Sequence, residues 1–316
     1  MQAVHTCKVM PIRAHDNFIK QLLSHKELAV DFLKEYLPGS LVKIIDFKTL
    51  THQDTSYINE NLKASFSDLV WSVEMHEKKK LRISLLLEHK SYADPEAAFQ
   101  LLDYLASGYR KQIKEKKKAE PIIPILYYHG KAGWTFKTLD TYFSGYPDLI
   151  QPYLPSFATE FVNLRHVSAE QIRALTNGLL TSAILYQKYY FDPEGLKANF
   201  HAILENLIPY LGLNITYSIF VYILQGPYLD SEFIKESIKN LSGDMSTRMM
   251  TAYDQLIAEG MQRGKEQGMA EGHEKALVQT ILNAHDNGID LATIRAITGE
   301  SEEKVNFILR KNRRIK

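Results

Sequence analysis

The segment Phe66–Ser91 (FSDLVWSVEMHEKKKLRISLLLEHKS) constrains the fold more than any other part of the chain. Apolar residues alternate with other residues on both sides of a short charged run, which is typical of two β-strands joined by a turn. A hairpin folded about Lys78 places apolar residues opposite one another on one face: Leu69 and Leu87, Trp71 and Leu85, Val73 and Ile83, and Met75 and Leu81.

The other face of this hairpin brings two carboxylates together. In the same register Asp68 lies opposite Glu88, with about 5 Å between their Cβ atoms. Lys90 projects from the face of Glu88, because side chains alternate along a strand. Facing carboxylates repel each other unless a cation compensates, and Mg²⁺ is the natural cation for oxygen ligands.

A metal ion held there would activate water and stabilise charge on a phosphate, with Lys90 placed to orient that water. The pattern therefore predicts phosphodiester hydrolysis. Strand ends often carry Asp, Glu and Lys, so the spacing alone also has a chance explanation. The four apolar pairs and the opposite charges of Glu74 and Arg82 favour this register, which a slip at the turn would change.

The surrounding sequence predicts an α/β fold with the element order α-β-β-β-α-β. We expect one or two helices over His15–Leu37, followed by strands over Val42–Leu50, Asp68–Met75 and Leu81–His89. A helix over Glu96–Lys117 and a strand over Ile122–Tyr128 complete the order. Leu139 to about Asn240 is mostly helical in pattern. We expect domains at residues 13–138, 139–257 and 258–316, the last of these a glycine-repeat helix and a small helical tail.

Composition excludes several classes of protein. With 316 residues, 45% of them hydrophobic, and a net charge of +1, the chain is neither largely disordered nor uniformly basic. The single cysteine, Cys7, excludes a disulfide framework and indicates a reducing, cytoplasmic compartment. The uncharged stretch Asn206–Leu229 is long enough to span a bilayer, but its polar residues favour a buried helix over Asn214–Leu224 and no membrane. Neither a phosphate-binding glycine loop nor a zinc or serine-hydrolase motif is present.

At the hairpin residues the chain resembles the PD-(D/E)XK nuclease superfamily, with Ser67-Asp68 in place of Pro-Asp and Glu88-His89-Lys90 as the E-x-K. More narrowly it resembles the Rpn family of recombination-promoting nucleases, also called YhgA-like putative transposases. The matching pieces are His15-Asp16-x-Phe18-x-Lys20, Ser67-Asp68-Leu69, Leu87-Glu88-His89-Lys90-Ser91, Tyr128-His129-Gly130 with Trp134, and the glycine repeat. They cover Arg13 to Trp134 well, and Thr135–Ile257 only weakly.

The resemblance implies a PD-(D/E)XK nuclease-like core and a magnesium-dependent DNA endonuclease acting in recombination or transposition. Asp68 and Glu88 would then be the metal ligands and Lys90 the catalytic lysine. Gln100 and Tyr104 resemble a Q-x-x-x-Y element that some members place beside the metal, although an amphipathic helix explains the same pair. Asp16 is either a further carboxylate or a helix cap.

Two basic segments are candidates for contact with DNA. The run Arg110–Lys118 ends the predicted helix of Gln100, and its cations either contact phosphates or interact with the helix C-terminus. The candidate residues are Arg110, Lys111, Lys114, Lys116, Lys117 and Lys118. The second segment is the tail, where helices over Lys275–His285, Leu291–Ile297 and Glu302–Lys311 are expected and the last two could form a helix-turn-helix.

A glycine recurs at every fourth position from Gly260 through Gly264 and Gly268 to Gly272. Each glycine costs a helix about 1 kcal/mol relative to alanine, so close helix–helix approach would offset the cost. The repeat therefore indicates either a helical contact, including one between copies of the chain, or a flexible tether.

Three hypotheses of function remain: a metal-dependent DNA endonuclease, a catalytically inactive DNA-binding or regulatory module on the same fold, and a phosphodiesterase acting on RNA. Convergence of Asp68, Glu88 and Lys90 on a divalent ion discriminates the first from the second.

Overall fold

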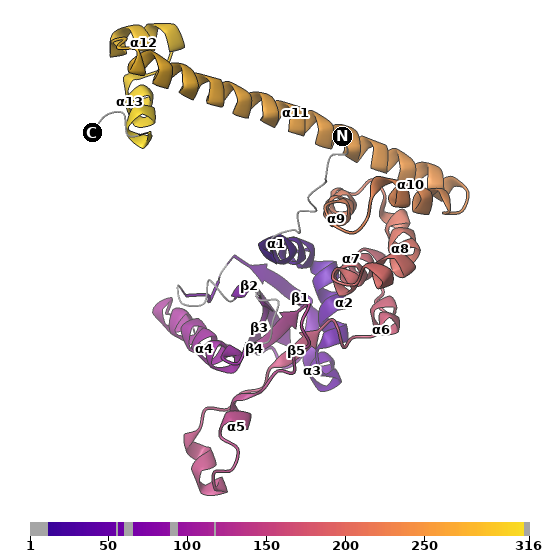
Figure 1. Cartoon of the computed structure of the whole chain (residues 1–316). Coiled ribbons are helices and arrows are strands. Elements are labelled where there is room, and N and C mark those ends of the chain that lie inside the picture. The colour runs from indigo at the N-terminus through magenta and orange to yellow at the C-terminus, as the bar shows by residue number, and fades with distance from the viewer. Residues whose placement is uncertain (1–11, 55, 60–65, 89–93, 117, 313–316) are drawn as a thin grey trace. The chain divides into compact units, whose positions relative to one another are not determined.

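The computed structural model describes residues 12–54, 56–59, 66–88, 94–116 and 118–312 (Figure 1). The chain divides into two compact units, Met1–Met250 and Thr251–Lys316.

A five-stranded mixed sheet forms the centre of the first unit. Its strands lie in chain order: β1 (Ile45–Gln53), β2 (Phe66–Met75), β3 (Lys80–Glu88), β4 (Ile122–Tyr128) and β5 (Glu160–Asn163). The strand β2 is antiparallel to both β1 and β3, whereas β4 runs parallel to β3 and β5 runs parallel to β4. The mixed α/β class and the order of the first four strands confirm the prediction. The sequence analysis missed β5, because four residues are too few to show a period among helices.

The hairpin confirms the predicted strands but corrects their register. Asp68 lies opposite Leu86, and Glu88 lies opposite Phe66 rather than Asp68. The turn is centred on Glu77 instead of Lys78, since Lys78 donates its backbone N–H to the Met75 carbonyl and takes a left-handed φ of 62°. Three-residue hairpin loops commonly end in such a residue. The shift is two residues, so every described strand position keeps its predicted face.

Helices cover both faces of the sheet (Figure 1). One face packs against α1 (Ile12–Leu23), α2 (Lys26–Tyr36) and α7 (Gly178–Tyr189), as the hydrogen bond of 2.6 Å from the Tyr127 hydroxyl to Gln187 in α7 illustrates. The other face packs against α4 (Ala97–Lys114), and there Val70, Leu86 and Leu126 are fully buried beneath Leu101 and Tyr104. Asp68 projects from this second face.

The remaining helices of the first unit are one that precedes β1 and several that follow β4 in the chain. They are α3 (Gly39–Ile44), α5 (Leu139–Tyr142), the 3₁₀ turn η1 (Asp148–Tyr153), α6 (Ala169–Arg173), α8 (Pro193–Leu207), η2 (Ile208–Tyr210), α9 (Asn214–Leu224) and α10 (Ser231–Lys239). The helix α9 has the bounds predicted for the buried apolar helix, and Ile219 and Ile223 are fully buried in it. Within the described part of the chain, no helix combines the length and apolarity required to cross a membrane.

The glycine repeat lies within one continuous helix, α11 (Asp244–Asp286). The separate helix predicted over Lys275–His285 is its last part, because nothing in the repeat interrupts the helix. Beyond it, α12 (Leu291–Thr298) and α13 (Glu302–Lys311) confirm the predicted pair, and all three pack through Ile281, Ile294, Val305 and Leu309. No described atom lies within 4 Å of where a Cβ would stand at Gly260, Gly264, Gly268 or Gly272, apart from the neighbouring residues and the helix's own backbone.

Candidate active site

The Asp68 carboxylate is buried and held by three donors. Asp68 is the third residue of β2 and is 5% exposed. Oδ1 accepts from the Ser56 hydroxyl at 2.5 Å, while Oδ2 accepts from the Tyr57 backbone N–H at 2.8 Å and from the Tyr104 hydroxyl at 3.0 Å. Three bonds from the segment after β1 and from α4 fix both oxygens in one orientation.

Tyr104 connects α4 to this carboxylate. Its ring is fully buried between the helix and the sheet, in contact with the Tyr57 ring at 5.8 Å between centroids. Burial, and then the negative charge of Asp68, hold the pKa of the Tyr104 hydroxyl well above its ordinary value. The hydroxyl therefore stays protonated and remains a donor to Asp68 at every physiological pH.

Gln100 lies one helical turn before Tyr104, on the same side of α4, as the Q-x-x-x-Y resemblance implied. Its amide Nε2 donates to Asp94 Oδ2 at 3.2 Å, and Asp94 is itself 6% exposed. The Gln100 Oε1 atom is buried and has no hydrogen-bond partner within the described residues. A buried amide oxygen of this kind normally meets a water, an ion or a ligand.

Two of the predicted site residues are described only in part. Glu88 is the last residue of β3, on the face of Asp68 and two residues beyond Leu86, which lies opposite Asp68. Diagonal positions of this kind are about 7–8 Å apart across an antiparallel pair. The Glu88 and Asp16 side chains and the whole of Lys90 lie outside the described residues, so their roles stay predictions.

The surroundings of the Asp68 carboxylate suit a hard divalent cation. Asp68 forms no ion pair with a described residue, and its three partners are neutral. A buried carboxylate without a cationic partner is costly, and oxygen-rich surroundings suit magnesium. No group of three or more His, Cys, Asp or Glu side chains capable of holding a metal occurs in the described part of the chain. Asp68 and Glu88 are therefore the candidate ligands, as the sequence predicted, and their binding of a metal stays a prediction.

The predicted DNA-contact residues lie in the second half of α4 and in the segment directly after it. Lys111 donates to the Ser56 carbonyl at 3.1 Å, on the residue that also binds Asp68. Arg110 lies 3.7 Å from Asp103, and Lys114, Lys116 and Lys118 are exposed. Lys117 lies outside the described residues. Since Lys114 is fourteen residues beyond Gln100, it stands about 21 Å further along the helix.

The sequence analysis missed Ser56, Tyr57 and Asp94. Ser56 and Tyr57 lie in an irregular segment without periodicity, so only the folded chain shows that they contact Asp68. Asp94 had a signal, because Asp-Pro directly before an apolar-periodic run is typical of a helix start.

Two histidines from the matching motifs meet on the opposite face of the sheet. His15 of α1 and His129 after β4 are buried, with ring centroids 5.0 Å apart. His15 Nδ1 pairs with the Tyr222 hydroxyl, which accepts from the Gln187 amide at 3.2 Å. These polar contacts join α1, α7 and α9 beside the sheet, and they place both histidines in the packing of the domain, on the face of the sheet opposite Asp68.

The family model described as "Putative transposase, YhgA-like" matches residues 13–209. The chain belongs to this family, which includes the Rpn recombination-promoting nucleases. The "inactive recombination-promoting nuclease-like protein RpnE" of Escherichia coli K12 is 29% identical over 291 residues, covering 88% of this chain and 93% of RpnE. The recombination-promoting nuclease RpnA of the same strain is 26% identical over 296 residues, which are 92% of this chain and 95% of RpnA.

A third relative matches a shorter part. The recombination-promoting nuclease RpnD of Escherichia coli O157:H7 is 33% identical over 133 residues, which are 40% of this chain and 51% of RpnD. No solved structure matches the chain.

Proposed function

We propose that the protein is a magnesium-dependent DNA endonuclease that promotes recombination or transposition, built on a PD-(D/E)XK nuclease core. The observation that carries the proposal is the Asp68 carboxylate, buried, fixed by three neutral donors and placed on the face of the sheet that also carries Glu88. The relatives named recombination-promoting nucleases support the same activity.

In this proposal Asp68 and Glu88 hold the metal, which would supply a water of lowered pKa and charge stabilisation at the phosphate. Ser56, Tyr57 and Tyr104 keep the Asp68 oxygens oriented. Gln100, with its unpartnered amide oxygen, orients a water or a substrate group beside the carboxylates. Lys90 stabilises the charge that develops on the phosphate during hydrolysis.

The basic residues of α4 and the following turn bind the phosphate backbone of DNA, in the cytoplasm. Lys111 is connected to Asp68 through Ser56, which bonds to both of them. Phosphate contacts are independent of sequence and weaken steeply with salt. A double variant, Lys114→Ala with Lys116→Ala, is expected to reduce DNA affinity and the slope of log Kd against log salt.

The glycine face of α11 supplies a surface for a second copy of the chain in this proposal. The four glycines are open in the described structure, and Met261 and Met269 between them are 72% and 66% exposed. A second helix packed on this face would bury the two methionines and allow close backbone approach.

A catalytically inactive DNA-binding module is the second candidate function. The specific observation in its favour is that RpnE, which aligns with 88% of this chain, is named inactive. Such a module needs the basic residues of α4 but not a metal held by Asp68 and Glu88.

The test is nicking of supercoiled plasmid by the purified protein with and without magnesium. The variants are Asp68→Asn, which preserves side-chain size, Lys90→Ala, and the matched controls Asp148→Asn and Lys79→Ala, which alter exposed residues of the same types. We expect magnesium-dependent nicking that both site variants lose and both controls keep. A parallel single-stranded RNA substrate separates DNA from RNA hydrolysis.

Salt-sensitive DNA binding without cleavage in any divalent metal would replace the endonuclease by the inactive module. Cleavage that persists in Asp68→Asn would show that the chemistry lies elsewhere in the chain.

A further inference from the structure

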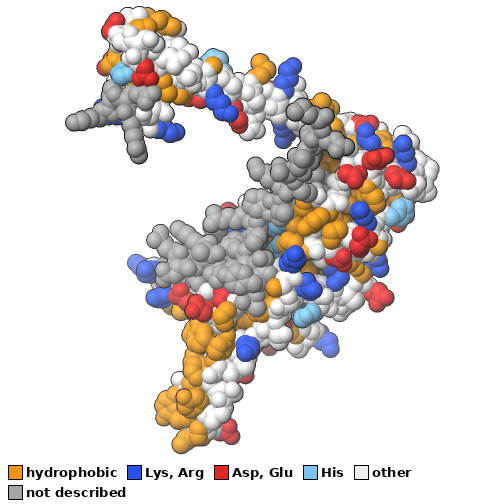
Figure 2. Space-filling model, in the orientation of Figure 1, with side chains coloured by type: hydrophobic (Ala, Val, Ile, Leu, Met, Phe, Trp, Pro, Cys, Tyr) orange, Lys and Arg blue, Asp and Glu red, His pale blue; other side chains and the backbone are white. Residues whose placement is uncertain are grey.

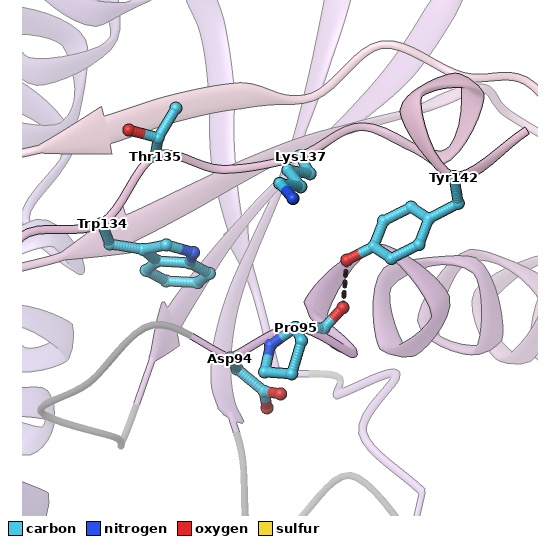
Figure 3. Close-up of a pocket in the computed structure, with 6 residues that line it drawn as sticks. All are labelled: Asp94, Pro95, Trp134, Thr135, Lys137 and Tyr142. Carbon is cyan, nitrogen blue, oxygen red and sulfur yellow. Dashed lines mark hydrogen bonds between the residues drawn. The ribbon is translucent and has the colours of Figure 1, made fainter. Parts of the chain in front are cut away.

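A small pocket opens between the residues that precede α4 and the segment that follows β4. Six residues line it: Asp94, Pro95, Trp134, Thr135, Lys137 and Tyr142 (Figure 3). Its volume is about 230 Å³. Sites for drug-sized ligands typically measure about 300–1,000 Å³, so this pocket suits a single flat ring system.

The pocket lies at the same edge of the sheet as the Asp68 site. The N-terminus of α4 and the carboxyl ends of β3 and β4 meet at this edge, because β4 is parallel to β3 and α4 connects them. Two contacts join the pocket to the site. Gln100 donates to Asp94 in the pocket wall, and Trp134 packs in the same apolar cluster as Tyr104, the partner of Asp68.

The Tyr128-His129-Gly130 motif explains how Trp134 is held in the pocket wall. The Tyr128 ring folds back over Gly130, where a Cβ would stand 2.4 Å from the ring, and its hydroxyl donates to the Ala132 carbonyl at 2.9 Å. Trp134 then meets the Tyr128 ring edge-to-face, with centroids 4.9 Å apart. The motif thus builds a rigid aromatic wall at the sheet edge, a role that the proposed catalysis does not use.

The opposite wall is also aromatic, and a cation lies between the two walls. The Tyr142 hydroxyl bonds to the Pro95 carbonyl, and its ring contacts Phe99 edge-to-face at 5.1 Å. Tyr142 and Phe99 are 38% and 42% exposed, which leaves aromatic surface open at the rim. Figure 3 shows the Lys137 ammonium between Trp134 and Tyr142.

The rim continues onto an apolar surface. Hydrophobic side chains gather along α5 and η1 in Figure 2, and in this region Tyr146, Leu149 and Tyr153 are 61%, 81% and 83% exposed. Aromatic side chains beside a cation are the elements with which proteins bind single-stranded nucleic acid, since bases stack on the rings and phosphates meet the cation.

We propose that this pocket binds one unstacked nucleotide of the substrate strand, with its base against Trp134 and Tyr142 and its phosphate at Lys137. This inference rests on the proposed function and adds to it a contact with the nucleotide beside the cleaved bond. The nuclease would therefore prefer DNA in which a base is easily extruded, such as single-stranded or mismatched sites.

Tryptophan fluorescence tests the proposal directly. Both tryptophans of the chain are buried, but Trp71 lies on the other face of the sheet whereas Trp134, 4% exposed, lines the pocket, so quenching by a nucleic acid bound there reports on Trp134. The probes are a single-stranded 12-mer DNA, the same strand with abasic sites throughout, and 5′-dAMP, in calcium to prevent cleavage. We expect saturable quenching by the 12-mer, almost none by the abasic strand, and weak binding of 5′-dAMP.

Two variants avoid the risk that replacing buried Trp134 unfolds the protein. Tyr142→Ala is expected to weaken binding of the 12-mer about tenfold, because base–aromatic stacking contributes that order of affinity. Lys137→Ala is expected to weaken binding and to reduce its dependence on salt, because one phosphate contact is lost. The matched control Lys131→Ala alters an exposed lysine of the same segment that does not line the pocket, and we expect this variant to bind like the wild type.

Equal quenching by the abasic strand, or wild-type affinity in both pocket variants, would overturn the proposal. Binding of 5′-dAMP as tight as that of the 12-mer would assign the pocket to a free nucleotide and overturn the substrate-strand role. Plasmid nicking is measured on the same samples. Quenching without nicking retains the pocket and rejects the nuclease, whereas nicking with no change in quenching retains the nuclease and rejects the pocket.

Discussion

Replacing Tyr104 by phenylalanine removes one of the three donors to Asp68 and retains the aromatic ring. The ring is fully buried, so phenylalanine retains its contacts with Tyr57 and the sheet. The lost bond, 3.0 Å from the hydroxyl to Oδ2, joins a neutral donor to a buried carboxylate. Bonds to charged groups contribute about 1.5–3 kcal/mol, so we expect the free energy of unfolding to fall by that amount.

The loss is measurable in thermal and urea unfolding followed by circular dichroism. In a unit the size of Met1–Met250, each kcal/mol shifts Tm by about 2–4 °C, which predicts a decrease of about 3–12 °C. The urea midpoint should fall without a change in the m-value, because the packing of α4 on the sheet is preserved. Plasmid nicking should be reduced but not abolished, since Ser56 and Tyr57 still hold the carboxylate.

The chain offers a matched control in Tyr36→Phe. The Tyr36 hydroxyl is also buried, but it has no hydrogen-bond partner among the described residues. Its removal should leave stability unchanged or slightly raised. If Tyr104→Phe proves no more destabilising than Tyr36→Phe, the bond to Asp68 contributes nothing and the reasoning about the fixed carboxylate is refuted.

Three further predictions concern other parts of the molecule. Glu120→Ala should destabilise the fold by about 3–5 kcal/mol in urea titration, because it leaves Arg82, 2.5 Å away and 8% exposed, as a buried unpaired charge. Burial, with a smaller effect of nearby His129, lowers the pKa of His15 from 6.5 to about 3. The unfolded chain therefore binds more protons below pH 6.5, and this group should remove about 2 kcal/mol of stability between pH 6.5 and pH 5, a loss that His15→Asn abolishes. Gly264→Leu with Gly268→Leu should shift the protein from oligomer to monomer in sedimentation velocity, if copies pair through α11.

Each of these has a contrary result. A double variant Arg82→Met, Glu120→Leu that is as unstable as Glu120→Ala would exclude the unpaired charge as the cause. An unchanged pH dependence in His15→Asn would assign acid sensitivity to other groups. Identical sedimentation of the glycine variant and the wild type would remove the glycine face from the assembly.

The alternation of side chains was enough to predict the strands β2 and β3, their faces and the placement of Asp68 and Glu88 on one of them. It was not enough to predict the register, because a shift of two residues preserves every face and depends on the conformation of one turn residue, Lys78. The four-residue strand β5 was missed for a related reason, since pairing with β4 rather than its own pattern makes it a strand.

The sequence by itself determined the first four strands, most of the helices, the family and the carboxylate at position 68, since these depend on local periodicity and on short motifs. Only the tertiary structure decided what surrounds that carboxylate. Ser56, Tyr57 and Tyr104 are distant from one another in the chain or lie in irregular backbone, and they meet at Asp68 because α4 packs across the sheet. Trp134 likewise became a pocket wall only through the folding of Tyr128 over Gly130. Side-chain contacts between distant segments arise from packing, and packing leaves no period in the sequence.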